Sequence, residues 1–331
     1  MVAQLNSTYI SMRPSSALAR LISYSFFEGR PVTTRGQWIN PIIFAQFYLL
    51  KRLPKLKAVK KPIFITGSGR SGTTILGVLM SMHRSVGFLN EPKAMWHSIF
   101  PSEDVIGSYG GDTAVRYCLT KDDVTPDVRR NALHLFGAYL RATSSERLVD
   151  KYPEHIFRVP FVKEIFPDSK FIFLVRNGWD TCSSIDLWSK KHGQTVKGER
   201  HDWWGVNQRK WRLMLEQLVP CDTLLGGVGS AIYGIKDQRN MAAVEWILTM
   251  QCGLRQMREN PGLLKLVRYE DLLSSPDEEL GKILEYCELQ EDPVLVDYAR
   301  RTLHAKNSHN IFNIHDRIKP AFDQTMQELG Y

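Results

Sequence analysis

The residues with the clearest chemical potential lie in a glycine-rich segment, residues 67–74, that follows the apolar run 63–66. Gly67 and Gly72 have the spacing of the two glycines in the phosphate-binding loop G-x-x-x-x-G-K-[ST]. Glycine lets the backbone turn tightly and point its N–H groups at an anion, and the start of a following helix adds partial positive charge. The segment therefore predicts an anion-binding loop between a strand and a helix.

One position departs from the nucleoside-triphosphate pattern. Thr73 stands in place of the lysine that reaches the β- and γ-phosphates, and Thr74 falls on the Ser/Thr position. The loop thus keeps an anion site, whereas a triphosphate site is not favoured. A P-loop kinase or nucleotide hydrolase remains an alternative, although no acidic partner for Mg²⁺ follows a later apolar run.

A second candidate site follows another apolar run, residues 170–175. Arg176 comes directly after it, and Ser184 lies about two helical turns into the helix expected next. A guanidinium group forms charge-assisted, bidentate bonds to a phosphate, and a hydroxyl adds a neutral donor. Taken alone, Arg176 would fit a surface salt bridge equally well. Its occurrence together with the first loop, in this order, favours a nucleotide site.

These two segments together resemble the cofactor-binding loops of sulfotransferases that use 3′-phosphoadenosine 5′-phosphosulfate (PAPS). The resemblance extends over residues 62–331 and includes segment 266–272, whose tyrosine lies near the adenine in that family. It implies that the first loop binds the 5′-phosphosulfate and that the second site binds the 3′-phosphate. The implied PAPS-binding residues are Gly69, Arg70, Ser71, Gly72, Thr73, Thr74, Arg176, Ser184 and Tyr269.

Sulfuryl transfer needs an in-line nucleophile, a base for its proton and positive groups near the oxygen that leaves. Arg70 and Lys151 are the candidate cations, and segment 147–153 resembles the strand that carries an active-site lysine in the family. A solvent-exposed surface lysine is the alternative for Lys151. Neither cation requires a metal, and no cysteine–histidine cluster has zinc-ligand spacing, so we expect no metal site.

Glu91 is the candidate general base. It follows the apolar run 86–89 and resembles the strand-end glutamate of the protein-tyrosine and carbohydrate-type branches. The small-molecule cytosolic branch instead has a histidine at a position that is Pro153 here, and His155 is expected to start a helix. A salt bridge to Arg70 is the structural alternative for Glu91. A weaker resemblance assigns a donor role to Ser308.

Apolar runs alternate with helical patterns from residue 62 onward, which predicts an α/β fold. We expect a P-loop-like three-layer α/β/α arrangement with a central, mainly parallel sheet and ligands at the carboxyl ends of its strands. Expected strands are 63–66, 86–89, 148–150, 170–175 and 264–268; expected helices are 74–82, 128–142, 156–166, 180–190, 204–219, 241–257 and 278–286. No linker divides this part, so residues 61–331 are predicted to form one sulfotransferase domain.

Residues 1–60 differ in character and are interpreted as an N-terminal amphipathic and basic extension. Segment 16–27 reads as a helix, segment 41–50 is apolar, and lysines alternate with apolar residues over 51–61. Packing against the domain is favoured, because amphipathic segments usually face a protein core. Peripheral contact of residues 41–61 with an anionic membrane surface is the alternative. A non-catalytic protein that binds anionic ligands through this segment is the second competing function.

Composition restricts the partners. The chain has 331 residues and a net charge of +8, which suits anionic ligands. Its basic residues are not interleaved with aromatics over a whole face, so we expect no nucleic acid partner. Segment 188–211, rich in tryptophan, is the expected acceptor region, for a glycan, a glycolipid or another small molecule. Five scattered cysteines and the absence of a signal-peptide pattern predict a cytoplasmic location; the oligomeric state is left open.

Overall fold

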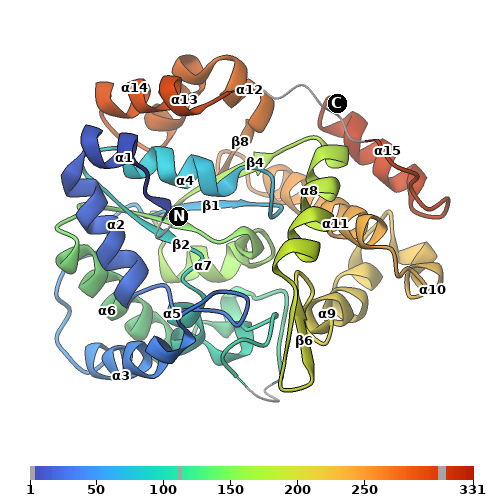
Figure 1. Cartoon of the computed structure of the whole chain (residues 1–331), viewed down its shortest axis with the longest axis horizontal. Coiled ribbons are helices and arrows are strands. Elements are labelled where there is room, and N and C mark those ends of the chain that lie inside the picture. The colour runs from blue at the N-terminus through green and yellow to red at the C-terminus, as the bar shows by residue number, and fades with distance from the viewer. Residues whose placement is uncertain (1–3, 111–113, 305–310) are drawn as a thin grey trace.

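The computed structural model describes residues 4–110, 114–304 and 311–331, and its centre is a five-stranded parallel sheet (Figure 1). The strand order is β2-β3-β1-β4-β8. Every run expected to be a strand is one, within one residue at each end, so the α/β class with a central parallel sheet is confirmed. The strands are β1 (Ile63–Gly67), β2 (Val86–Asn90), β3 (Arg147–Lys151), β4 (Lys170–Val175) and β8 (Leu264–Arg268).

Helices cover both faces of the sheet, because successive side chains of a strand point to opposite sides. Ile63 and Ile65 pack in a hydrophobic cluster with α4, α13 and α14, whereas Phe64 packs in a second cluster with α6, α7 and α11. The predicted three layers are therefore present. The helices are α1 (Ser7–Met12), α2 (Pro14–Phe26), α3 (Asn40–Leu50), α4 (Thr73–Ser81), α5 (Lys93–Ile99), α6 (Pro126–Ala142), α7 (Val159–Ile165), α8 (Gly178–His192), α9 (Arg209–Gln217), α10 (Gly229–Ile232), α11 (Gln238–Glu259), α12 (Tyr269–Ser274), α13 (Pro276–Tyr286), α14 (Pro293–Thr302) and α15 (Lys319–Glu328).

Two expected helices are wrong in part. The segment 156–166 is divided into a 3₁₀ turn, Pro153–Arg158, and the short helix α7, each with a proline in its first turn. The segment 204–219 becomes helical only at Arg209, because Asn207 and Gln208 adopt positive φ angles of 47° and 61°. Positive φ angles are incompatible with a right-handed helix.

A small antiparallel sheet precedes α9 and extends away from the central sheet (Figure 1). Its strands are β5 (Gln194–Val196), β6 (Glu199–Asp202) and β7 (Gly205–Val206). Lys197 and Gly198 form the tight turn between β5 and β6 with φ angles of 52° and 84°. Positive φ at both central residues matches the right-handed twist of a hairpin. This hairpin, which the sequence analysis did not predict, carries part of the site described below.

The N-terminal segment is fixed to the sheet by a buried ion pair. Arg20 of α2 donates to Glu28 and also to the backbone oxygen of Phe88 in β2, at 3.0 Å. Both side chains are buried. Because burial of a charge is costly unless it is paired, this contact fixes the position of residues 28–34 relative to the strand ends. The predicted domain boundary near residue 60 stays a prediction.

The basic segment 51–61 is an irregular connection and not an amphipathic helix. Two of its lysines donate to backbone oxygens of the domain, Lys51 to Ser98 at 2.9 Å and Lys57 to Ser145 at 2.7 Å. Ile42 and Leu49 on the outer side of α3 are exposed. Membrane contact through residues 41–61 stays a prediction. Within the described ranges, no helix combines the length and apolar character needed to cross a bilayer.

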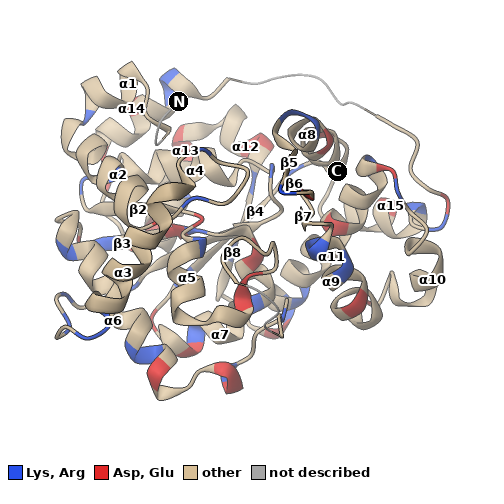
Figure 2. Cartoon of the chain, turned by 60° about the horizontal axis from the view of Figure 1, so that its bottom comes forward, with Lys and Arg blue, Asp and Glu red and all other residues tan. Residues whose placement is uncertain are grey.

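Acidic and basic residues are interspersed over the helices (Figure 2). This distribution agrees with the modest net charge of +8. No large patch of one charge is apparent on the described helices in this view.

Replacing Arg20 by Met should lower the free energy of unfolding by about 3–5 kcal/mol, because it leaves Glu28 buried without its partner. The double variant with Glu28→Met should recover much of that loss. Urea unfolding of both variants tests this. A change below about 1 kcal/mol for Arg20→Met would show that the pair does not anchor the N-terminal segment.

Candidate functional site

The predicted site residues meet at the carboxyl edge of the central sheet, where a cavity of about 390 Å³ opens. Strand β1 lies between β3 and β4, so the chain changes direction across the sheet at this point. Ligands of open α/β sheets bind at such a position. Of the predicted residues, those that line the cavity are Gly69, Arg70, Thr73, Thr74, Glu91 and Lys151. Ser71, Gly72, Arg176, Ser184 and Tyr269 do not line it.

The glycine-rich loop joins β1 to α4 as predicted, and its geometry requires glycine at two positions. A Cβ atom on Gly67 would lie 2.3 Å from the backbone oxygen of Leu174, and one on Gly72 would lie 2.3 Å from the Tyr269 ring. The loop is further held by Ser71, whose hydroxyl donates to the Ser68 oxygen at 2.6 Å. Tyr269 therefore packs directly against the anion-binding loop.

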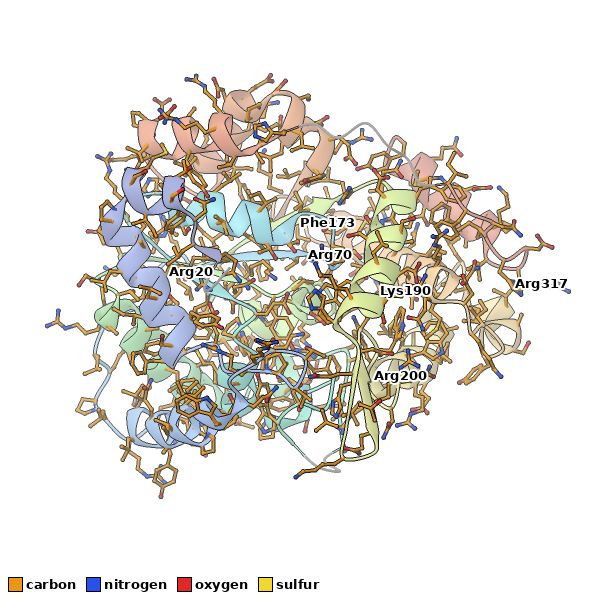
Figure 3. The ribbon with its side chains drawn as sticks, viewed as in Figure 1. Arg20, Arg70, Phe173, Lys190, Arg200 and Arg317 are labelled. Carbon is orange, nitrogen blue, oxygen red and sulfur yellow. The ribbon has the colours of Figure 1, made fainter. Side chains whose placement is uncertain are left out.

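Two arginines lie together beside this loop, although like charges repel. Arg176 donates to the backbone oxygen of Arg70 at 3.1 Å, and Arg70 Nε donates to the Ser184 hydroxyl at 3.2 Å. The Arg176 guanidinium lies 4.8 Å from the centre of the Tyr269 ring. Figure 3 places Arg70 near the middle of the molecule, between α4 and α8. The structure thus brings Arg70, Arg176 and Ser184 into one cluster.

The electrostatics of this cluster favour an anion. Burial, and then the neighbouring Arg176, lower the pKa of Arg70. Arg176 Nε is buried without a hydrogen-bond partner among the described residues, and the Asp180 carboxylate lies 3.8 Å from the Arg176 guanidinium. An anionic ligand would relieve the repulsion and accept the unused donors. The cluster is therefore suited to a phosphate group.

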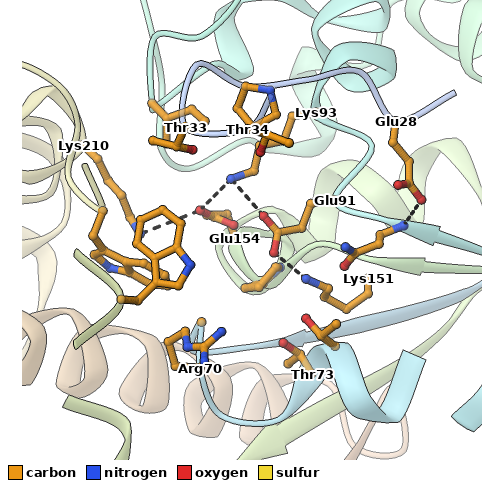
Figure 4. Close-up of a pocket in the computed structure, with 18 of the residues that line it drawn as sticks. Glu28, Thr33, Thr34, Arg70, Thr73, Glu91, Lys93, Lys151, Glu154 and Lys210 are labelled. Atoms are coloured by element: carbon orange, nitrogen blue, oxygen red, sulfur yellow. Dashed lines mark hydrogen bonds and ion pairs between the residues drawn. The ribbon is translucent and has the colours of Figure 1, made fainter. Parts of the chain in front are cut away.

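Glu91 and Lys151 form an ion pair at the ends of β2 and β3 (Figure 4). Lys151 is 1% exposed, so the solvent-exposed alternative is wrong, and Glu91 is 36% exposed. Glu91 pairs with Lys151 and with Lys93, at 3.2 Å, and not with Arg70. Its φ angle of 52° is left-handed. This conformation is costly for a non-glycine residue and is held in place by the surrounding structure.

The pKa of Glu91 is shifted in a way that bears on its chemistry. Burial alone would raise it, but Lys151 and then Lys93 lower the pKa of this carboxyl well below its ordinary value. Glu91 is therefore ionised at neutral pH and able to accept a proton. It is a weak base as long as both lysines remain beside it.

Further charged groups continue from this pair across the cavity wall. Lys93 lies 3.8 Å from Glu154, which lies 3.8 Å from Lys210 (Figure 4). Lys210 also pairs with Glu245 at 2.5 Å. We call Lys151, Glu91, Lys93, Glu154, Lys210 and Glu245 the charge ladder. Burial would raise the pKa of Glu154, yet Lys93 and Lys210 lower it. The ladder gives the cavity a polar wall whose charges are mutually balanced.

The tryptophan-rich segment contributes two tryptophans to the cavity and two to the core. Trp203 and Trp188 line the cavity with their rings 5.3 Å apart. A Cβ atom on Gly69 would lie 2.4 Å from the Trp203 ring, so this ring rests on the anion-binding loop. Trp204 is buried and packs on Trp211.

The N-terminal segment forms another wall, which the sequence analysis did not anticipate. Residues 28–31, Thr33 and Thr34 line the cavity. Figure 4 shows Thr33 and Thr34 on the opposite side of the Glu91–Lys151 pair from Arg70 and Thr73. The cavity therefore lies between the anion-binding loop and residues from the N-terminal part of the chain.

His155 does not line the cavity. It is buried and its ring contacts those of Trp96 and Tyr152, with Nε2 at 3.6 Å from Asp150. Burial lowers its pKa, so it is neutral at pH 7. Pro153 lines the cavity as the residue after Tyr152. Of the two candidate bases, Glu91 lines the cavity and His155 does not.

No cluster of three or more metal-binding side chains occurs among the residues that the structure describes. Ser308, with its weakly implied donor role, lies outside those residues. Some cavity residues were missed by the sequence analysis although a signal existed: Lys93 and Glu154 each follow a predicted strand end by a few positions. Lys210 and Glu245 had none, because separate helices, α9 and α11, bring them together.

Comparisons with known proteins find similarity to one family. Residues 62–225 match the model described as the sulfotransferase family. A Caenorhabditis briggsae protein assigned as a protein-tyrosine sulfotransferase is 24% identical over 250 residues, which are 73% of this chain and 68% of that protein. The nodulation protein NoeE of Sinorhizobium fredii is 25% identical over 240 residues, which are 71% of this chain and 51% of NoeE.

Other similar proteins match a smaller part of this chain or have a lower sequence identity to it. A protein-tyrosine sulfotransferase of Drosophila melanogaster is 30% identical over 126 residues, 37% of this chain and 24% of that protein. This chain thus spans about half the length of NoeE and about a quarter of the Drosophila protein. Among solved structures, the sulfotransferase domain of the Synechococcus PCC 7002 olefin synthase has a TM-score of 0.49 at 16% identity, covering 84% of this chain and 97% of that domain.

Replacing Lys93 by Met should raise the pKa of Glu91, because Lys93 is one of the two cations that lower it. Carbon NMR titration of the glutamate carboxyls measures this directly: protonation of Glu91 should begin at a higher pH than in the unmodified chain. Lys57→Met, in the connection 51–61 and outside the cavity, is the matched control and should leave the pKa of Glu91 unchanged. An unshifted Glu91 in Lys93→Met would contradict the electrostatic assignment.

Proposed function

This chain belongs to the sulfotransferase family of enzymes, and we propose that it transfers a sulfuryl group from PAPS to a hydroxyl group of a carbohydrate acceptor. One observation carries the proposal: the Arg70–Arg176–Ser184 cluster and the Glu91–Lys151 pair meet at the same edge of the sheet. The first suits a nucleotide phosphate, and the second suits acid–base chemistry at a hydroxyl group.

For the donor, we assign the 5′-phosphosulfate to residues 69–74 and the 3′-phosphate to Arg176 and Ser184. The backbone of the loop and the start of α4 present N–H groups to an anion. Tyr269, packed between Gly72 and Arg176, provides an aromatic surface for the adenine side of the nucleotide. Thr73 in place of a lysine supports a monophosphate-type anion and weighs against a nucleoside triphosphate.

For the transfer step, an acceptor oxygen attacks sulfur while the bond between sulfur and the bridging phosphate oxygen breaks. Glu91 takes the proton of the acceptor hydroxyl, and 3′-phosphoadenosine 5′-phosphate (PAP) leaves. Lys151 and Arg70 stabilise the negative charge that develops on the bridging oxygen. As Lys151 turns from Glu91 toward that oxygen, Glu91 loses a cation and becomes a stronger base.

For the acceptor, the charge ladder and the tryptophans support a polyhydroxylated molecule. Carboxylate and ammonium groups of the ladder can each exchange hydrogen bonds with sugar hydroxyls, and the Trp203 and Trp188 rings offer faces for the apolar side of a sugar. Two relatives are assigned as protein-tyrosine sulfotransferases, so a tyrosyl peptide is the second candidate acceptor. Labelled PAPS, assayed against panels of glycosides, glycolipids and tyrosyl peptides, separates the two.

Replacing Arg176 or Ser184 by Ala should weaken PAP binding far more than binding of adenosine 5′-phosphosulfate, which lacks the 3′-phosphate. Loss of a charge-assisted hydrogen bond costs about 1.5–3 kcal/mol, a tenfold to hundredfold change in affinity. Calorimetric titration with both nucleotides measures the difference. Equal losses of affinity for the two nucleotides would contradict the assignment of the 3′-phosphate to Arg176 and Ser184.

Replacing Glu91 by Gln should reduce turnover by roughly 10²–10⁴, because the amide keeps the shape but accepts no proton. Affinity for PAP should change much less than turnover, since Glu91 pairs with Lys93 and Lys151 and not with Arg70 or Arg176. Glu164→Gln on α7, outside the cavity, is the matched control and should retain turnover. Near-normal turnover in Glu91→Gln would show that Glu91 is not the general base.

A further inference from the structure

Arg30 is a buried cation in the cavity that the proposed transfer step does not use. It lies in the N-terminal wall, lines the cavity and is 5% exposed. No carboxylate of the described residues lies within ion-pair distance of its guanidinium group. The adjacent acid, Glu28, is engaged by Arg20 and by the backbone N–H of Asn90. The unused side-chain donors of Arg30 are accessible from the cavity, where an anionic ligand can accept hydrogen bonds from them.

The surroundings of Arg30 hold it in one orientation. Asn40 binds its backbone on both sides: its side-chain oxygen accepts from the Arg30 N–H at 2.8 Å and its amide donates to the Arg30 carbonyl at 2.7 Å. The guanidinium lies 3.5 Å from the centre of the Tyr24 ring and donates through Nη1 to the Gly29 oxygen at 2.7 Å. Its other donors make no hydrogen bond to any described residue. The Arg30 guanidinium is therefore held in a fixed orientation and has N–H groups available for a ligand.

The other cations of the cavity are already engaged. Lys93, Lys151 and Lys210 are ion-paired within the charge ladder. Arg70 belongs to the proposed donor cluster. Arg30 lies on the wall that also carries Thr33 and Thr34, and Figure 4 shows those two residues across the Glu91–Lys151 pair from the anion-binding loop. An anion bound by Arg30 would therefore lie across the Glu91–Lys151 pair from the proposed donor site, where the acceptor is expected.

We propose that Arg30 binds an anionic group of the acceptor, separate from the hydroxyl that reacts, so that the enzyme selects an acidic sugar. This inference rests on the proposed sulfuryl transfer to a carbohydrate. A carboxylate or a phosphate ester on the sugar has the required chemistry, because either accepts two parallel N–H bonds from a guanidinium group. Arg30 is thus a specificity-determining residue and takes no part in proton transfer.

Three methyl glucosides that differ only at carbon 6 test the proposal. The group there is a methyl (the 6-deoxy sugar), a carboxylate (the uronic acid) or a phosphate ester. Sulfuryl transfer from PAPS to each is measured as kcat/KM. The unmodified enzyme should prefer an anionic sugar over the 6-deoxy sugar by about tenfold or more. The preferred one of the two anionic sugars identifies the anion.

Arg30→Gln should reduce that preference to about twofold or less while retaining transfer to the 6-deoxy sugar, because the amide keeps donors but loses the charge. Arg30→Lys, which keeps the charge without the planar stacking on Tyr24, should retain part of the preference. Arg52→Gln, with the same loss of charge outside the cavity, is the control and should leave the preference unchanged. Thermal melting and PAP affinity of each variant verify the fold.

An undiminished preference in Arg30→Gln would overturn the inference, as would a loss of PAP affinity equal to the loss of anionic-sugar turnover, which would place Arg30 on the donor. Transfer to none of the three sugars by an enzyme that binds PAP would overturn it as well and leave the proposed donor site standing. Failure of the unmodified chain to bind PAP would instead contradict the proposed function itself.

Discussion

Charge burial at the carboxyl edge of the sheet is the constraint on which the rest of the site depends. A buried lysine or glutamate is tolerated only when opposite charges surround it. The members of the charge ladder other than Glu91 are at most 12% exposed, and each member is paired with the next. The ladder joins residues from β3, the β2 end, α5, α9 and α11. Its requirement for pairing therefore fixes how these elements meet and leaves Glu91 ionised beside Lys151.

The same rule distinguishes arginines whose charge is compensated by a carboxylate from arginines whose charge is not fully compensated. Arg20 is buried with Glu28 as its partner and serves as an anchor. Arg70 and Arg176 lie beside one another, and Arg30 is buried with no carboxylate of the described residues at ion-pair distance. The charge of each of these three residues is therefore less fully compensated than that of Arg20. They lie on two sides of the Glu91–Lys151 pair. This arrangement supports the proposal that Arg70 and Arg176 bind the anionic sulfuryl donor and that Arg30 binds an anionic group of the acceptor.

Much of the fold and part of the site could be predicted from sequence because the signals are local. Strands β1, β2 and β4 are mainly apolar segments of five or six residues. The residues at the ends of β1, β2, β3 and β4 meet at one edge because the strands are parallel. Glu91 and Lys151 could thus be placed near each other. The N-terminal wall and the pairing of Lys210 with Glu245 depend on contacts between segments far apart in the chain, for which a single sequence carries no periodic signal. The hairpin had a weak signal in Lys197–Gly198, which the aromatic run after it obscured.

The central claim is that this edge of the sheet binds PAPS and not a nucleoside triphosphate. Thermal melting in the presence of PAP, compared with ATP and Mg²⁺, tests it most directly, because a ligand that binds the folded state raises the melting temperature according to its affinity. The account predicts a clear rise with PAP and little change with ATP and Mg²⁺. A rise with ATP and Mg²⁺ alone would contradict it and indicate a P-loop nucleotide enzyme.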